Sequence, residues 1–258
     1  MLGHVSGWSR ADLLAHPEQL VPAPMERAFN ALVARRELSE PIAYLLGRRE
    51  FYGRTFKVDR RALIPRPETE LLVELGKAAV ARWRGAGVEP IVVDVGAGSG
   101  AVAVSLAAEC GLKVIATDLS LDALLLAREN ACEYAARIAV VATDLLAGLR
   151  GPLHAVLANL PYVPLGRSLP PDVAGYEPPM ALFGGARGTE LIERLLAEAR
   201  PLLAPGAELA VELDEEQQAT PIASLARRLY PSAEVSVCRD AGGYDRAVRV
   251  VLSPPRAG

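Results

Sequence analysis

The chain is poor in the residue types that form disulfide frameworks, zinc sites and histidine-based active sites. Among its 258 residues, 3 are cysteine and 3 are histidine. Cys110, Cys132 and Cys238 are far apart and form no C-x-x-C pair, so neither a disulfide framework nor a metal site is predicted. His154 begins an apolar run and stands beside no candidate nucleophile. Nucleophilic, histidine-based and metal catalysis therefore have no evident residues.

Long apolar runs and an excess of positive charge are also lacking. The most apolar stretch, residues 91–108, contains Asp94 and three glycines, and is too interrupted to span a bilayer. Residues 1–30 show no basic segment followed by an apolar one, as a signal peptide would. The net charge of −3 gives no general attraction to nucleic acid or anionic membrane. We expect a cytoplasmic globular protein.

Residues 1–64 differ in pattern from the rest of the chain. Apolar residues at helical spacing over 11–46 predict helices, and a short helix is expected to begin near Ser39–Pro41 and stop at Gly47. Apolar residues on both sides of Gly53–Arg54 predict a β-hairpin. The predicted units are a helical domain over residues 1–50, a hairpin linker over 51–64 and a larger domain over 65–258.

Short β-rich runs alternate with helical segments after residue 90. The expected strands are Ile91–Val95, Lys113–Thr117, Ile138–Ala142, His154–Ala158, Ala207–Leu213, Glu234–Arg239 and Arg246–Leu252. Apolar strands separated by helices predict a parallel sheet covered on both faces. No helix fits between the last two strands, so they should pair antiparallel. The predicted fold class is α/β, with a seven-stranded sheet that ends in an antiparallel hairpin.

A glycine loop, Gly96–Gly100, follows the first expected strand and opens a helix. Glycines permit a tight turn and a close approach of a ligand to the backbone, and ligands bind at this edge of a parallel sheet. Gly96-x-Gly98-x-x-Ala101 with Asp118 about twenty residues later also matches the dinucleotide pattern. The loop alone leaves the ligand open.

Three features favour a nucleoside ligand without a pyrophosphate. Asp94 precedes the first glycine by two residues, where its carboxylate would face a cationic amino-acid moiety. Asp144 follows the third strand and is suited to accept from an adenine amine. The terminal hairpin breaks the all-parallel order of a dinucleotide domain. With Asp118 as the ribose acceptor, these features fit S-adenosylmethionine.

The sequence Asn-Leu-Pro-Tyr, Asn159–Tyr162, follows the fourth strand. A planar amide or adenine nitrogen is a poor nucleophile because its lone pair is delocalised. The Asn159 side-chain carbonyl and the backbone carbonyl of Leu160 can accept both N–H hydrogens of such a group, which orients it and favours positive charge on it. Pro161 rigidifies the turn, and the Tyr162 ring offers a stacking face. These four residues are the predicted catalytic and substrate-binding segment.

At these positions the sequence resembles the peptide-chain release factor glutamine N5-methyltransferases, the HemK or PrmC type. The matching stretches are Glu40–Leu45, Glu50–Gly53, Leu63–Glu70, Asp94–Gly100, Thr117–Ser120, Asn159–Tyr162, Tyr176–Pro178 with Ala181–Leu182, Glu212 with Gln217, and Asp240 with Asp245–Arg246. They span nearly the whole chain, and the run Ile-Pro-Arg-Pro-Glu-Thr-Glu is the most distinctive.

The resemblance implies a class I S-adenosylmethionine-dependent methyltransferase, Rossmann-like, with a small N-terminal helical domain that docks the release factor. It implies methylation of the glutamine side-chain amide in the Gly-Gly-Gln motif of class 1 release factors, with S-adenosylhomocysteine as the product. Residues implied to contact the cofactor are Gly96, Ala97, Gly98, Ser99, Gly100, Asp118, Leu145 and Asn159. Residues implied to line the substrate mouth are Arg66, Pro67, Glu68, Thr69 and Glu177, although the proline-rich stretch could instead be a rigid linker.

Two departures from the family pattern are visible. Leu160 replaces the first proline of the usual Asn-Pro-Pro-Tyr, which leaves the backbone carbonyl in place. Residues Met1–Val5 align part-way into the helical domain of the family, so this domain is expected to be shortened and its docking to be affected more than catalysis.

Alternative functions remain open from the residues alone. Asn-Leu-Pro-Tyr also occurs in rRNA adenine dimethyltransferases, so the first alternative is adenine N6-methylation of RNA or DNA. That function calls for a basic groove, and the overall acidity argues against a nucleic-acid partner. A nicotinamide-dependent oxidoreductase is disfavoured by the terminal hairpin and by Asn159–Tyr162. A binding module without catalysis would not combine a cofactor loop with a clamp for a target nitrogen.

Overall fold

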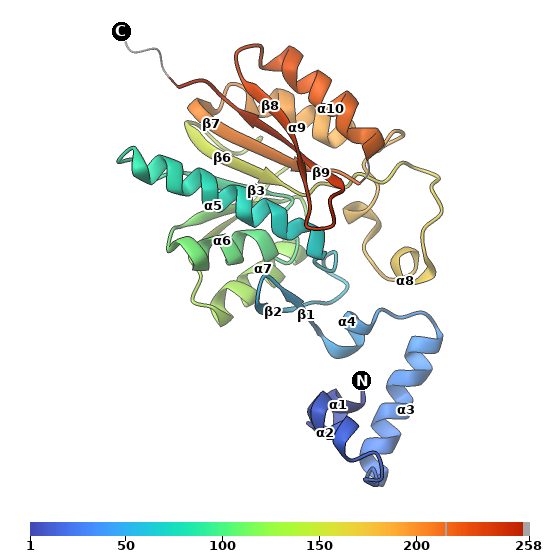
Figure 1. Cartoon of the computed structure of the whole chain (residues 1–258). Coiled ribbons are helices and arrows are strands. Elements are labelled where there is room, and N and C mark those ends of the chain that lie inside the picture. The colour runs from blue at the N-terminus through green and yellow to red at the C-terminus, as the bar shows by residue number, and fades with distance from the viewer. Residues whose placement is uncertain (215, 255–258) are drawn as a thin grey trace.

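The N-terminal part of the chain is helical, as predicted. The computed structural model describes residues 1–214 and 216–254; the side chains of Glu216 and Gln217 also lie outside the described residues, so the family match at Gln217 has no structural counterpart. The first helices are α1 (Leu2–Ser6), α2 (Arg10–Ala15), α3 (Ala23–Glu37) and α4 (Ile42–Leu46). Helices α1, α2 and α3 contain no buried residue. In Figure 1 they lie at one end of the molecule, away from the sheet.

A seven-stranded sheet forms the centre of the larger part. Its strands are β3 (Val92–Val95), β4 (Val114–Asp118), β5 (Ile138–Ala142), β6 (Leu153–Ala158), β7 (Leu203–Glu212), β8 (Glu234–Arg239) and β9 (Asp245–Val251), in the order β5-β4-β3-β6-β7-β9-β8. Strands β3 to β7 pair parallel, and β9 pairs antiparallel with both β7 and β8. The predicted sheet with its terminal antiparallel pair is confirmed.

Helices cover both faces of this sheet because its strands alternate apolar residues between two cores. Helices α5 (Glu70–Gly85), α6 (Ala101–Cys110) and α7 (Leu121–Glu133) lie on one face, and α9 (Glu190–Ala199) and α10 (Glu216–Leu229) on the other (Figure 1). Val92 packs in the first core and its neighbour Val93 in the second, as the twofold period of a strand requires. Helix α10 was not predicted from the sequence.

The hairpin of β1 (Arg48–Phe51) and β2 (Arg54–Lys57) is docked on the larger domain. It begins earlier than the predicted linker because Gly47, with φ 67°, ends α4 in the left-handed conformation and turns the chain directly into β1. The Asn130 side chain of α7 accepts from the Lys57 N–H at 2.8 Å and donates to the Lys57 carbonyl at 3.1 Å. Its Nδ2 also donates to the Ser99 carbonyl at 2.9 Å, so one side chain ties the hairpin to the glycine loop.

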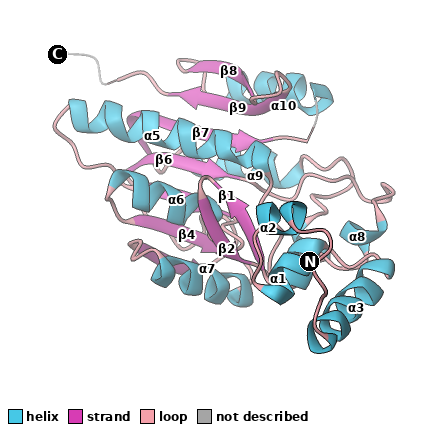
Figure 2. Cartoon of the chain, turned by 60° about the horizontal axis from the view of Figure 1, so that its bottom comes forward, coloured by secondary structure: helices cyan, strands magenta, loops and turns pink. Residues whose placement is uncertain are grey.

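The segment between β6 and α9 connects the N-terminal helices to the site. It contains α8 (Pro171–Ala174) and the short 3₁₀ turn η2 (Pro179–Ala181), and Figure 2 shows α8 beside α3. The Tyr176 hydroxyl donates to the Leu38 carbonyl at 2.8 Å, and Arg36 lies 3.8 Å from Asp172. Within the described part of the chain, every helix is too short or too polar to cross a membrane.

Candidate active site

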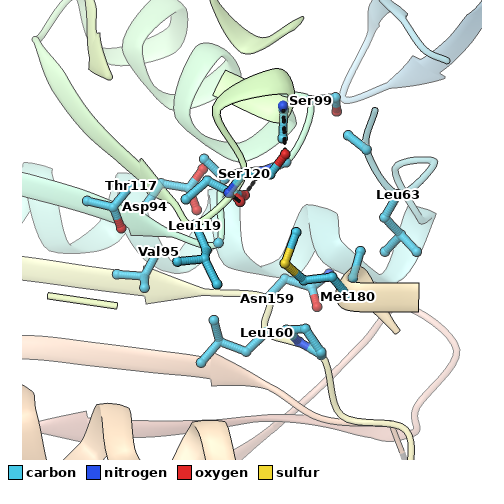
Figure 3. A pocket seen from close by; sticks show the side chains of 18 of the residues that line it. Leu63, Asp94, Val95, Ser99, Thr117, Leu119, Ser120, Asn159, Leu160 and Met180 are labelled. Atoms are coloured by element: carbon cyan, nitrogen blue, oxygen red, sulfur yellow. Dashed lines mark hydrogen bonds between the residues drawn. The ribbon is translucent and has the colours of Figure 1, made fainter. Parts of the chain in front are cut away.

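The carboxyl ends of β3, β4 and β6 open onto one cavity. Residues from all three strand ends, from the stretch before α5 and from η2 line it, including Leu63, Arg66, Thr69, Asp94, Gly96, Ala97, Gly98, Ser99, Asp118, Leu119, Asp144, Leu145, Asn159, Leu160, Pro161 and Met180. Figure 3 shows Asn159 and Met180 on one side of this cavity and Asp94 and Ser120 on the other. The topology therefore brings together residues that are more than ninety positions apart, from Leu63 to Asn159.

The glycine loop turns from β3 into α6 with three left-handed residues. Gly96 has φ 72°, and a Cβ there would lie 3.0 Å from the Leu160 side chain. Gly98, with φ 55°, donates its N–H to Asp118 Oδ2 at 2.9 Å. A Cβ on Gly100 would meet Ala127 at 2.9 Å, so this glycine allows α6 to pack on α7 and is not among the described residues that line the cavity.

Asp94 lies at the end of β3 and is 2% exposed. Its Oδ2 accepts a hydrogen bond from the Ala103 N–H at 3.0 Å. Burial raises the pKa of the Asp94 carboxyl to about 7; the Ala103 N–H lowers it and the nearby charge of Asp118 raises it further. A cation placed beside this carboxyl would favour its ionised form, which is the electrostatic requirement of a ligand with an ammonium group.

Asp118 ends β4 at the cavity. Its Oδ2 accepts from the Gly98 N–H, and its Oδ1 accepts from the Ser120 N–H at 2.8 Å. Burial raises the pKa of this carboxyl, and the backbone N–H donors of Ser120, Gly98 and Leu119 oppose the rise. Each carboxylate oxygen can accept more than one hydrogen bond, so Asp118 can hold the loop and accept from a sugar hydroxyl together.

Asp144 and Leu145 line the cavity beyond β5. The Asp144 carboxylate is half exposed and pairs with Arg194 at 2.9 Å. Its predicted contact with an adenine amine stays a prediction, and this ion pair competes with it. Leu145 adopts a left-handed conformation with φ 47° and is 7% exposed, which turns its apolar side chain inward.

The chemistry of the lining fits S-adenosylmethionine. The buried carboxyl of Asp94 suits a cationic amino-acid group, and the carboxylate of Asp118 suits a ribose. Thr117 Oγ1, buried at the cavity, has no hydrogen-bond partner among the described residues and can serve a polar ligand. Apolar side chains of Leu119, Leu145 and Met180 supply the flat contacts that a nucleobase needs.

Asn159 follows β6 and lies at the junction of two adjoining cavities. It lines the large cavity and also a smaller one, together with Leu63, Arg66, Leu160 and Ala181. Its Nδ2 donates to Thr69 Oγ1 at 3.0 Å. Because the amide nitrogen faces Thr69, the amide oxygen points away from Thr69 and stays available as an acceptor.

Tyr162 belongs to the smaller cavity, where Val163, Leu169, Val173 and Leu182 supply apolar side chains alongside the polar groups of Arg66 and Asn159 in the same lining. Its hydroxyl donates to Glu212 Oε1 at 3.4 Å, and burial raises the pKa of this hydroxyl. The ring therefore lies beside Asn159 and outside the large cavity, as a group that contacts a substrate next to the cofactor would.

The Pro65–Glu70 stretch approaches the site through some of its residues. Arg66 lines both cavities, and its guanidinium pairs with the buried carboxylate of Glu177, which also accepts from the Ile64 N–H at 3.0 Å. Thr69 ends the 3₁₀ turn η1 (Pro67–Thr69) and lines the large cavity. Pro67, Glu68 and Glu177 are not among the described residues that line either cavity. Glu177 lies behind Arg66 and is connected to the cavities through its ion pair with that residue.

Several residues at the site were not singled out from the sequence. Leu119 is 62% exposed and Met180 is 53% exposed, although both are apolar, and both line the cavity. The sequence does carry a signal for Leu119, which is an apolar residue directly after Asp118, the aspartate that ends its strand. The sequence alone assigned no role to Glu212, because its burial next to Tyr162 can be seen only in the fold.

The fold and this cavity define a class I S-adenosylmethionine-dependent methyltransferase. Residues 71–168 match the methyltransferase small domain, and residues 1–47 match the PrmC N-terminal domain. The catalytic domain of hMettl16 in complex with MAT2A 3'UTR hairpin 1 shares this fold, with a TM-score of 0.61, 16% identity, and coverage of 84% of this chain and 83% of that one.

Curated relatives identify the family. The release factor glutamine methyltransferase of Deinococcus radiodurans is 38% identical over 252 residues, which cover 96% of this chain and 88% of that protein. The protein of the same name from Moorella thermoacetica is 40% identical over 253 residues, covering 95% and 87%. The chain belongs to the release factor glutamine methyltransferase family, and the predicted family membership is confirmed.

Proposed function

We propose that this chain transfers the methyl group of S-adenosylmethionine to the side-chain amide nitrogen of the glutamine in the Gly-Gly-Gln motif of class 1 peptide-chain release factors. The observation that carries the proposal is the place of Asn159, which lines both a cavity suited to the methyl donor and an adjoining, mostly apolar cavity. A glutamine side chain in the smaller cavity would bring its amide to Asn159.

The residues around the junction suit an amide substrate. Asn159 Oδ1 and the backbone carbonyl of Leu160 are the two acceptors for the N–H hydrogens, and Tyr162 lies against the same space. Accepting both hydrogens orients the nitrogen and stabilises the positive charge that grows on it during transfer. S-adenosylmethionine, when bound, supplies an electrophilic methyl group on a positively charged sulfur. Asp94 is the proposed acceptor for its ammonium group.

We infer the roles of the domains from the same family. Residues 1–50 are proposed to dock the release factor, residues 51–64 to link the two domains, and residues 65–258 to carry out methyl transfer. Residues 255–258 lie outside the described part of the chain. The match of residues 1–47 to the PrmC N-terminal domain supports this division. Because the proposed substrate belongs to the translation machinery, the proposed site of action is the cytoplasm.

A protein substrate is favoured over nucleic acid. The net charge of −3 offers no general attraction for phosphates. The test incubates the chain with labelled methyl donor and one of three substrates: a release factor, the same factor with the motif glutamine replaced by alanine, and ribosomal RNA. Label in the unmodified factor alone supports the proposal. Label in the RNA, or equal label in both factors, would overturn it.

A further inference from the structure

A side chain of helix α10 holds the carbonyl group of Tyr162. Gln218 Nε2 donates to this carbonyl at 2.9 Å, and Gln218 Oε1 accepts from the Asp214 N–H at 3.2 Å. These two partners fix the orientation of the amide, because exchanging its nitrogen and oxygen would break both hydrogen bonds. Gln218 is 9% exposed and is not among the described residues that line either cavity. It therefore contacts the Asn159–Tyr162 segment from outside the cavities.

The other end of this link, at Asp214, is itself anchored to the sheet. Arg246 of β9 donates from its guanidinium to the Asp214 carbonyl at 2.8 Å and to the Leu213 carbonyl at 3.3 Å. The backbone carbonyl of Arg246 accepts from the Leu213 N–H at 2.8 Å. Gln218 thus ties the turn after β6 to a point that β9 holds in place.

The loop 184–188, which precedes α9, packs against the same stretch of backbone. The Gly184 N–H donates to the Val163 carbonyl at 3.0 Å. A Cβ on Gly188 would lie 2.1 Å from the Tyr162 carbonyl oxygen, closer than any side chain tolerates. The Tyr162 carbonyl therefore lies between a donor, Gln218, and a glycine backbone that leaves it no room to turn away.

The Leu160 carbonyl, two residues earlier in the turn, is in the opposite situation. Among the described residues, no hydrogen bond is made to it, so it is open to a donor from a ligand. Pro161 stands between the two carbonyls, and its ring fixes φ. Once the peptide plane after Tyr162 is held, the Leu160 carbonyl has little freedom left.

We propose that Gln218 is a positioning residue for methyl transfer, which holds the Tyr162 carbonyl against Gly188 and thereby keeps the Leu160 carbonyl and the Tyr162 ring in place for the substrate amide. The inference rests on the proposed function. Gln218 does not touch the reacting atoms and acts through the backbone of Tyr162.

The test variant is Gln218→Met, which has a similar length and volume but donates no hydrogen bond to the Tyr162 carbonyl. We expect kcat for transfer to the release factor to fall by roughly 10–100-fold, the range that a displacement of about 1 Å near the reacting atoms produces. KM for the factor and the Kd of S-adenosylmethionine should stay within about threefold, because residues 1–50 and Asp94 are untouched.

The matched control is Tyr230→Phe, beyond the far end of the same helix. The Tyr230 hydroxyl donates to the buried Leu196 carbonyl at 2.6 Å. Residue 230 lies twelve positions after residue 218, which is about 18 Å along a helix. Both variants lose a side-chain hydrogen bond to a backbone carbonyl, so their melting temperatures should fall by similar amounts. Tyr230→Phe should keep the wild-type kcat, which separates positioning from support of the fold.

A second pair of variants tests the glycine on the other side of the carbonyl. Gly188 has φ 78° and Gly87 has φ 76°, but a Cβ on Gly87 would meet no atom within 4 Å. Gly87→Ala therefore measures the backbone strain alone and should keep its kcat. Gly188→Ala adds the collision with Tyr162 and should lower kcat at least as much as Gln218→Met. The double variant of Gln218 and Gly188 should lose little more than the worse single one, because both act on one carbonyl.

The outcomes are distinct. A Gln218→Met enzyme with wild-type kcat would overturn the inference, and so would a loss that Tyr230→Phe shares or that is accompanied by an equal loss of S-adenosylmethionine binding. A wild type that does not methylate the factor would overturn the proposed function and this inference with it.

Discussion

Asp94 combines full burial with a place beside the proposed binding site of a cation. Two residues before the glycine loop, it could be recognised from the sequence by its position alone. Its pKa could not be predicted in this way, because the value of about 7 results from burial in the fold and from the charge of Asp118, which lies on another strand. Asn159 shows the same limit: its place after a strand was predictable, but its contact with Thr69, ninety positions away, was not.

The pH dependence of cofactor binding tests Asp94. A cationic ligand binds the carboxylate, so below pH 7 binding must first remove a proton. The Kd of S-adenosylmethionine should rise by up to about tenfold per pH unit below 7 and level off above it. Calorimetry in buffers of different ionisation enthalpy should show proton release at pH 6. In Asp94→Asn the Kd should be weaker and nearly independent of pH; an unchanged, pH-independent Kd in the wild type would contradict this account.

At the scale of elements, apolar runs located the strands well. The bounds of β5 and β8 equal the predicted ones, since each is a short β-rich run. Helix α10 was missed because Pro221 and the polar residues near its start mask the spacing of Ala219, Ile222, Ala223 and Ala226, all of which are buried against the sheet. The hairpin was predicted from the sequence. Its docking on α7 was not, because it depends on a tertiary contact of Asn130 that local sequence patterns do not predict.

Asn130 is expected to be the main polar anchor of that hairpin. Asn130→Ala removes three hydrogen bonds, one of them to the buried carbonyl of Ser99, which should cost about 2–4 kcal/mol of unfolding free energy. In a chain of this size the melting temperature should fall by roughly 5–12 °C. Asn30→Ala, at an exposed position of α3, serves as the control and should leave melting unchanged. Equal melting curves for the two variants would show that Asn130 does not anchor the hairpin.

At the scale of the whole molecule, two bodies of different character meet near the site. The sheet and its helices contain both large cores, whereas α1, α2 and α3 have no buried residue. The two bodies contact each other through the Tyr176–Leu38 hydrogen bond and through the approach of Arg36 to Asp172. Asp172 and Tyr176 lie on the segment that leads to Glu177, which pairs with Arg66. The division into residues 1–50, 51–64 and 65–258 stays a prediction, and the route of this connection could be seen only in the fold.

Removal of residues 1–37 should therefore separate docking from chemistry. Because no core residue is lost, S-adenosylmethionine should bind with an unchanged Kd, and a short Gly-Gly-Gln peptide should be methylated at the same kcat/KM as by the full chain. Transfer to the intact release factor should fall roughly tenfold or more in kcat/KM, as the loss of about 1.4 kcal/mol of docking implies. A parallel fall for peptide and factor would contradict a docking role.

The measurement that tests the central claim most directly compares wild type and Asn159→Ala for methyl transfer to the release factor and for binding of S-adenosylmethionine. Asn159 Oδ1 is the proposed acceptor that orients the substrate amide, so its loss should lower kcat by about 10²–10³-fold. The Kd of the methyl donor should change by less than about threefold, because the loop and Asp94 are intact. Transfer at the wild-type rate by Asn159→Ala would contradict the account.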